Sequence, residues 1–201
     1  MTSTASTWVG MRVFSNAAKS MNFFKDLLLS RSYWLTLAVA SAAMMATALY
    51  YQYVLGEEPC QVCIQARLWV VGFMLVATVM TLLPNTRSLR SLGNCLALAC
   101  AIGLVERSWF LYQLENGMGD GSCEFQLGMP DWFAVDRWFP TLFEVRNLCS
   151  FTPEMLFGLS MAESLLLAAA GMVLTVLASL AATRLITVSA DSETRLAPPP
   201  S

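Results

Sequence analysis

Residues 60–83 read CQVCIQARLWVVGFMLVATVMTLL, a Cys-x-x-Cys pair joined to an apolar run. The run is long enough to cross a membrane, because a crossing takes about 20 apolar residues at a rise of ~1.5 Å each. A Cys-x-x-Cys pair alone is compatible with a redox dithiol, half of a zinc site or a haem attachment. At the mouth of a membrane helix it is a dithiol beside the lipid, where hydrophobic electron carriers dissolve.

The rest of the chain has the same apolar character. Of its 201 residues, 56% are hydrophobic and 13% are charged, whereas about a quarter are charged in an ordinary soluble domain. Core helices of a soluble protein need polar outer faces, yet residues 35–49 contain no charge. We therefore predict an all-α membrane protein, a bundle of four transmembrane helices. The spans are expected at about 32–55, 64–83, 92–114 and 159–180.

Basic residues predict the orientation, because they favour the cytoplasmic side of a membrane. They gather before the first expected span, between the second and third, and after the fourth: Arg12, Lys19, Lys25, Arg31, Arg87, Arg90, Arg184 and Arg195. Both termini should then be cytoplasmic. The long loop between the third and fourth spans carries seven acidic and two basic residues, so the outer face should be acidic.

This topology divides the chain into three parts. Residues 1–31 form a cytoplasmic segment, 32–186 the membrane domain and 187–201 a disordered cytoplasmic tail. The outer loops are 56–63 and 115–158, and the longer loop is expected to carry a short helix on the membrane surface.

Two of the six cysteines, Cys95 and Cys100, fall within the third span, where small core residues are the simplest interpretation. The other four fall on the outer side or at its edge: Cys60, Cys63, Cys123 and Cys149. Disulfides persist outside the cytoplasm. Pairing of Cys60 with Cys63 and of Cys123 with Cys149 is the natural choice, but three connectivities are possible and the sequence alone does not decide among them.

Zinc and purely structural disulfides are the alternatives for these four cysteines. Structural zinc sites favour two close pairs, whereas Cys123 and Cys149 stand 26 residues apart, and the chain has no histidine to complete a mixed site. We therefore expect no metal. A stapling disulfide suits Cys123 and Cys149. It suits Cys60 and Cys63 less, because so small a ring gives little entropic stabilisation and such pairs tend to be reactive.

Position also favours a reactive pair. Cys63 should lie in the first turn of the second span, where unpaired N–H groups and the helix dipole favour an anion. Arg67 lies one turn deeper on the same face, and both effects stabilise a thiolate. Arg67 is alternatively an interfacial anchor, and the two roles can coexist. Glu106 and Arg107 in the third span are either functional intramembrane charges or side chains that reach water at the outer surface.

The segment Pro130–Pro140, PDWFAVDRWFP, interleaves aromatic and charged residues. Trp and Phe favour the bilayer interface. We expect this segment to lie on the outer membrane surface, with a packed soluble lid as the alternative.

These features together resemble the DsbB family of bacterial inner-membrane disulfide-forming proteins. The resemblance runs from about residue 32 to 186. It is carried by the P-C-x-x-C-x-x-x-R motif at Pro59–Arg67, the second cysteine pair, the P-x-W-x-x-x-D-R-W-x-P motif at Pro130–Pro140, and Gly158–Met161 entering the last span. It implies a four-helix bundle that reoxidises a periplasmic thioredoxin-like protein of the DsbA type.

The resemblance also implies roles for individual residues. Cys123 is attacked by the partner's thiolate, with Cys149 as its pair, and the electrons pass to Cys60 and Cys63. Cys63 then faces a quinone, assisted by Arg67, and the membrane pool of ubiquinone or menaquinone takes the electrons. The expected location is the bacterial inner membrane, with lipid as surroundings and no nucleic-acid partner.

Two other functions stay open. One is a membrane dithiol reductase of the vitamin K epoxide reductase type, which sends electrons outward. The other is a non-enzymatic scaffold stapled by two disulfides. The longer basic N-terminus and the Pro-rich tail leave open whether the chain serves many clients or one.

Overall fold

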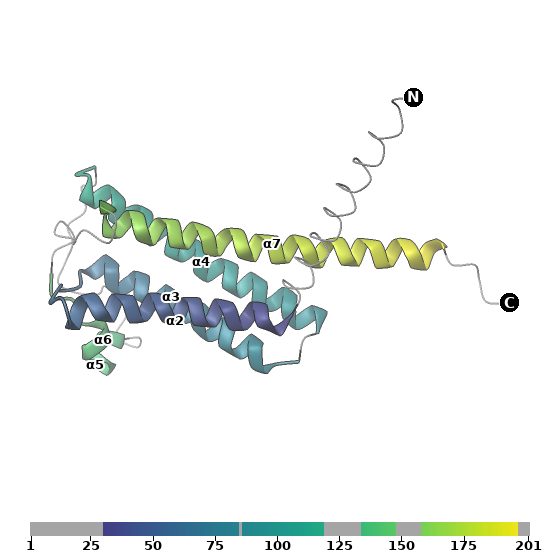
Figure 1. Ribbon diagram of the computed structural model, residues 1–201, viewed down its shortest axis with the longest axis horizontal. Helices are drawn as coiled ribbons and strands as arrows, with labels where there is room; N and C mark the ends of the chain where they lie inside the picture. The colour runs from purple at the N-terminus through teal and green to yellow at the C-terminus, as the bar shows by residue number, and fades with distance from the viewer. Residues whose placement is uncertain (1–29, 85, 119–133, 148–157, 197–201) are drawn as a thin grey trace, which may run out of the picture.

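The computed structural model describes residues 30–84, 86–118, 134–147 and 158–196, the last twelve of these by backbone only. Four long helices dominate these residues (Figure 1): α2 (Arg31–Tyr53), α3 (Gln61–Leu82), α4 (Arg87–Glu115) and α7 (Met161–Leu196). Each contains a stretch long and apolar enough to cross a membrane. The predicted four-helix membrane fold is confirmed.

Two short helices lie at one end of the bundle, α5 (Val135–Trp138) and α6 (Pro140–Phe143) (Figure 1). At this same end α2 finishes and α3 begins, so we call it the cysteine end of the bundle.

The helix bounds differ from the expected spans in two places. α4 begins at Arg87, before the expected residue 92, because the Thr86 side chain caps it by accepting from the Leu89 N–H at 3.4 Å. α7 continues to Leu196, into the tail for which disorder was expected from residue 187. Residues 187–196 contain no Gly or Pro, so nothing in the sequence ends the helix before the prolines that start at Pro198.

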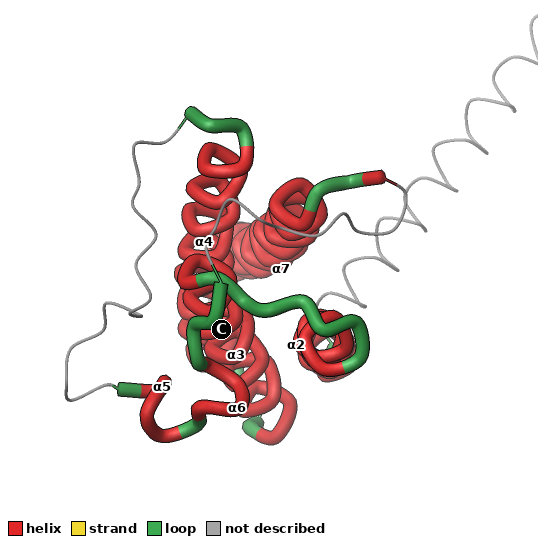
Figure 2. Tube along the Cα trace, turned by 90° about the vertical axis from the view of Figure 1, so that its left-hand side faces the viewer, coloured by secondary structure: helices red, strands yellow, loops and turns green. Residues whose placement is uncertain are grey.

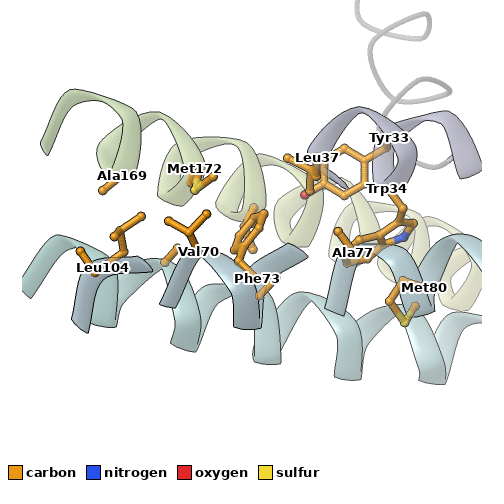
Figure 3. Close-up of a cluster of buried hydrophobic side chains, with 14 residues drawn as sticks. Tyr33, Trp34, Leu37, Val70, Phe73, Ala77, Met80, Leu104, Ala169 and Met172 are labelled. Atoms are coloured by element: carbon orange, nitrogen blue, oxygen red, sulfur yellow. The ribbon is translucent and has the colours of Figure 1, made fainter. Parts of the chain in front are cut away.

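α3 is the central element, because it packs extensively against both α2 and α4, while α4 packs against α7. Each long helix contributes to the main core, for example Trp34, Phe73, Leu104 and Val176, all of which are fully buried. Figure 3 shows Phe73 and Val70 of α3 among the side chains that fill the space between the helices.

α2 and α7 meet only in part. Away from the cysteine end, the Tyr33 hydroxyl donates to the Thr175 carbonyl at 3.5 Å, and Leu37 joins Met172 in the core. Among the described helices these two are not an extensively packed pair, and Figure 2 shows them apart when viewed from the cysteine end. The bundle therefore has one loosely closed side, between α2 and α7.

Candidate functional site

The two cysteines of the motif begin α3. Cys60 is the N-cap residue, with extended backbone angles, and its Sγ accepts from the Cys63 N–H at 3.3 Å. Helix caps are usually side-chain oxygens, so here a sulfur atom takes that place. Cys63 lies in the first turn as expected. Both side chains are thiols and both are buried, with 2% and 5% of their surface exposed.

The pKa of the Cys60 thiol is lowered from its ordinary value. The main cause is a hydrogen bond from the Cys63 side chain, with the Cys63 and Val62 amides adding to it, while burial opposes the shift. The sequence placed the helix-stabilised thiolate at Cys63, whereas the sulfur that receives the first-turn amide is that of Cys60. The reason is geometric, because an N-cap side chain points back at the free amides of the first turn.

Arg67 lies one turn beyond Cys63 and is only 6% exposed. Its Nη1 donates to Gln52 Oε1 at 2.5 Å and to the Leu142 carbonyl at 3.2 Å, and its Nη2 donates to the Ala48 carbonyl at 3.3 Å. Its Nε–H is buried and has no acceptor among the described residues. A snorkelling anchor would expose its guanidinium, so this geometry favours a role inside the bundle.

Cys63 and Arg67 line the same hollow between α2 and α7. Its other walls are mostly apolar and include Met44, Met161 and Leu165. This hollow has a volume of about 50 Å³. A second hollow of about 230 Å³, which Cys63 and Arg67 do not line, adjoins it, because those three residues line both. Together the two hollows form a mostly apolar groove, which we call the α2–α7 groove, along the loosely closed side of the bundle.

The segment after α6 contacts the dithiol from the other side. The N–H groups of Arg146 and Asn147 both donate to the Pro59 carbonyl, at 3.0 and 3.2 Å, and Asn147 forms a parallel bridge with Cys60. Cys149 follows Asn147 by two residues in the sequence. Cys123 and Cys149 themselves lie outside the described residues, so their expected pairing is not tested.

The N-terminus of α7 closes the site. Ser160 and Glu163 form a capping box, in which Ser160 Oγ accepts from the Glu163 N–H at 3.2 Å and Glu163 Oε2 accepts from the Ser160 N–H at 3.0 Å. Glu115 of α4 adds a third contact by accepting from the Ala162 N–H at 3.3 Å. Ala162 packs in one cluster with the two cysteines. Sequence reasoning missed this cap, although the S-x-x-E pattern before an apolar run signals it.

Glu106 and Arg107 are not brought to the dithiol. Arg107 pairs with Glu106 at 2.8 Å and donates to Gln65 Oε1 at 3.0 Å. Their side chains are 60% and 34% exposed, and neither lines the α2–α7 groove. This arrangement favours the second of the two interpretations, in which these side chains reach water at the surface.

The aromatic loop segment is described from Ala134 onward. It forms α5 and α6, and Trp138 and Phe139 are largely exposed. Exposed aromatic side chains at this end suit a membrane surface, which stays a prediction. Within the described part of the chain, no three His, Cys, Asp or Glu residues are grouped as a metal site requires.

Comparison with known proteins gives a consistent result. A family model described as "Disulfide bond formation protein DsbB" matches residues 30–179. "Disulfide bond formation protein B 2" of Pseudomonas aeruginosa is 34% identical over 135 residues, which cover 66% of this chain and 80% of that protein. "Disulfide bond formation protein B" of Shewanella denitrificans is 34% identical over 142 residues, or 70% and 81% of the two chains. The counterpart from Haemophilus influenzae is 34% identical over 134 residues, or 66% and 76%.

Proposed function

The chain belongs to the DsbB family of disulfide bond formation proteins, and on that premise we propose that it is a quinone-dependent thiol oxidase. It oxidises a periplasmic thioredoxin-like dithiol protein of the DsbA type and passes the electrons to ubiquinone or menaquinone. Family membership and four membrane helices make it a multi-pass membrane oxidoreductase. The quinone, the partner and the inner-membrane orientation belong to the proposal.

One observation carries the proposal. Cys63 and the buried Arg67 line an apolar groove between α2 and α7, on the side of the bundle that would face lipid. A quinone ring is apolar and carries two carbonyl acceptors. The groove offers apolar walls, the Cys63 thiol and the side chain of Arg67, a cationic hydrogen-bond donor. The residues present therefore fit a quinone, with Arg67 as the donor to one carbonyl.

The electrons pass through two cysteine pairs by thiol–disulfide exchange. In the first exchange, the partner's two thiols become a disulfide and the Cys123–Cys149 disulfide becomes two thiols. In the second, those thiols form their disulfide again and the Cys60–Cys63 disulfide becomes two thiols. Each exchange moves two electrons and two protons. The Cys60 and Cys63 thiols then give two electrons and two protons to a quinone bound in the groove, and the Cys60–Cys63 disulfide forms again.

The structure gives the two cysteines of α3 different surroundings, which supports a division of labour. A β-bridge joins the backbone of Cys60 to that of Asn147, in the segment that leads to Cys149. The lowered pKa of Cys60 favours its thiolate form. Cys63 lines the groove. We assign Cys60 to the exchange with the loop pair and Cys63 to the quinone side, with Arg67 beside it.

Steady-state turnover tests the function. Purified protein is given a reduced thioredoxin-fold dithiol protein and a short-chain ubiquinone, and the quinone absorbance is followed. Quinone loss should require the dithiol protein and disappear in Cys63→Ser and Cys123→Ser, while Cys95→Ser serves as the matched control and keeps full activity. Turnover that survives in Cys123→Ser would remove the loop pair from the route. Electrons that flow only from quinol to an oxidised partner would indicate the reductase instead.

A further inference from the structure

Gln52 belongs to none of the sequence motifs, yet its side chain contacts both Arg67 and the loop helix α6. It lies in the last turn of α2 and is half-buried. Its Oε1 accepts from Arg67 Nη1 at 2.5 Å, and its Nε2 donates to the Thr141 carbonyl at 3.3 Å. One partner is a donor and the other an acceptor, which fixes the orientation of the amide.

These contacts hold one edge of the guanidinium in place. Nη1 uses its two hydrogens on Gln52 and on the Leu142 carbonyl, and Nη2 donates to the Ala48 carbonyl. Gln52 is the only side-chain acceptor among these three partners. Three of the five N–H donors are used in this way. The Nε–H and the second hydrogen of Nη2 have no acceptor among the described residues, on a side chain that lines the groove beside Cys63. The orientation of these two donors therefore depends on the hydrogen bonds that the other three make.

We propose that Gln52 is a positioning residue for quinone binding, which acts by holding the Arg67 guanidinium in the orientation that a quinone carbonyl requires. This inference rests on the proposed function, because it assigns a second residue to the same groove. An uncharged acceptor suits this role, because it fixes the guanidinium without cancelling its positive charge. A methionine of similar length makes neither hydrogen bond, and a glutamate keeps only the acceptor.

Quinone affinity in a double-mutant cycle tests the proposal. A short-chain ubiquinone is titrated into the oxidised protein in detergent, and tryptophan fluorescence quenching gives Kd for wild type, Gln52→Met, Arg67→Met and the double variant. Loss of a hydrogen bond to a charged group predicts that Gln52→Met weakens binding by about tenfold. Because Gln52 acts through Arg67, the double variant should bind no more weakly than Arg67→Met alone.

Two control variants separate this role from a general effect on the bundle. Gln113→Met makes the same change in the last turn of α4, away from the groove. Tyr53→Phe removes a second hydrogen bond to the Thr141 carbonyl and leaves every hydrogen bond of Arg67 in place. Both should bind quinone like wild type. If Tyr53→Phe weakens binding as much as Gln52→Met does, anchoring of α6 explains the effect and the proposal is overturned.

The remaining outcomes are also decisive. Additive losses in the double variant, or wild-type affinity in Gln52→Met alongside weak binding in Arg67→Met, would overturn the role of Gln52 and leave the quinone site standing. Wild-type affinity in Arg67→Met would instead overturn the quinone site itself. If Gln52→Met unfolds in detergent, Gln52→Glu decides the matter, because it keeps the acceptor but cancels the positive charge of Arg67. Weaker quinone binding in that variant supports the proposal, and wild-type affinity contradicts it.

Discussion

Cys60 and Cys63 stand three residues apart but differ in what surrounds each sulfur atom. The Cys60 sulfur caps α3 and lies beside the loop segment at Asn147, whereas Cys63 lines the α2–α7 groove. A dithiol that takes electrons from one side and delivers them to the other needs such a difference. The hydrogen bond from Cys63 is also the main cause of the lowered pKa of Cys60.

That hydrogen bond predicts a pH dependence. With Cys123 and Cys149 replaced by serine, Cys63→Ser keeps a donor beside Cys60, whereas Cys63→Ala removes it, so the pKa of Cys60 should be higher in the alanine variant. The thiolate fraction rises with pH through the pKa, and a lowered pKa moves that rise to lower pH. Alkylation of Cys60 by iodoacetamide should therefore begin at lower pH in Cys63→Ser. Superimposable pH profiles would show that the Cys63 side chain has no such effect.

At this scale, helical spacing made some of the site predictable. The period of 3.6 residues places Cys63 in the first turn of α3 and Arg67 one turn deeper, and both lie there. Gln52, Leu142 and Asn147 were not predictable, because their contacts join residues 15 to 87 positions apart in the chain. Local spacing gives no information about which distant residues the loop brings to the site.

Besides α3, α7 is a helix whose start forms part of the site. Ser160, Glu163 and Glu115 satisfy three N–H groups at this end, and Ala162 packs against the dithiol. The position of the α7 N-terminus thus determines where Ala162 packs against the two cysteines.

The capping box should contribute measurably to stability. Ser160→Ala removes the oxygen that accepts from the Glu163 N–H, and loss of such a cap costs about 1 kcal/mol. We expect a lower midpoint of thermal unfolding in detergent, with Ser160→Thr close to wild type because it keeps the hydroxyl. An unchanged midpoint in Ser160→Ala would mean that other contacts alone hold the start of α7.

Close packing of α3 on α4 depends on Gly103. A Cβ atom at this position would come within 2.5 Å of the Trp69 ring, whereas a Cβ at Gly171 of α7 would meet nothing within 4 Å. Gly103→Ala should therefore destabilise the protein, by about 1–3 kcal/mol as for other overpacked sites. Gly171→Ala should be neutral or slightly stabilising. Equal unfolding midpoints for the two variants in detergent would contradict the close approach.

For the molecule as a whole, apolar length and composition were enough to predict the four membrane helices. They were not enough to predict how the helices pair, because a span that is apolar on every side does not indicate which face meets protein and which meets lipid. The order of packing, with α3 central and the α2–α7 side loosely closed, comes from the shapes of side chains in contact. The groove therefore could not be predicted from the sequence, although two of the residues that line it, Cys63 and Arg67, were predicted site residues.

The orientation of the whole molecule in the membrane can also be predicted and tested. Alkaline phosphatase, which is active only in the periplasm, can be fused after Pro84 in the short loop or after Gly117 at the end of α4. The positive-inside rule predicts activity for the Gly117 fusion and none for the Pro84 fusion. The reverse pattern would place the dithiol in the cytoplasm and remove a periplasmic partner.

A single-turnover reaction shows whether electrons leave the chain at Cys63 for a quinone. A variant with Cys123 and Cys149 replaced by serine is reduced, freed of reductant and mixed anaerobically with excess short-chain quinone in a stopped-flow spectrophotometer. We expect that one quinone is lost per protein as the Cys60–Cys63 disulfide forms. Adding Cys63→Ser should abolish the loss, and adding Cys95→Ser should leave it unchanged. Undiminished quinone loss without Cys63, or a reduced dithiol that leaves the quinone unchanged, would show that electrons do not leave the chain at Cys63 for a quinone.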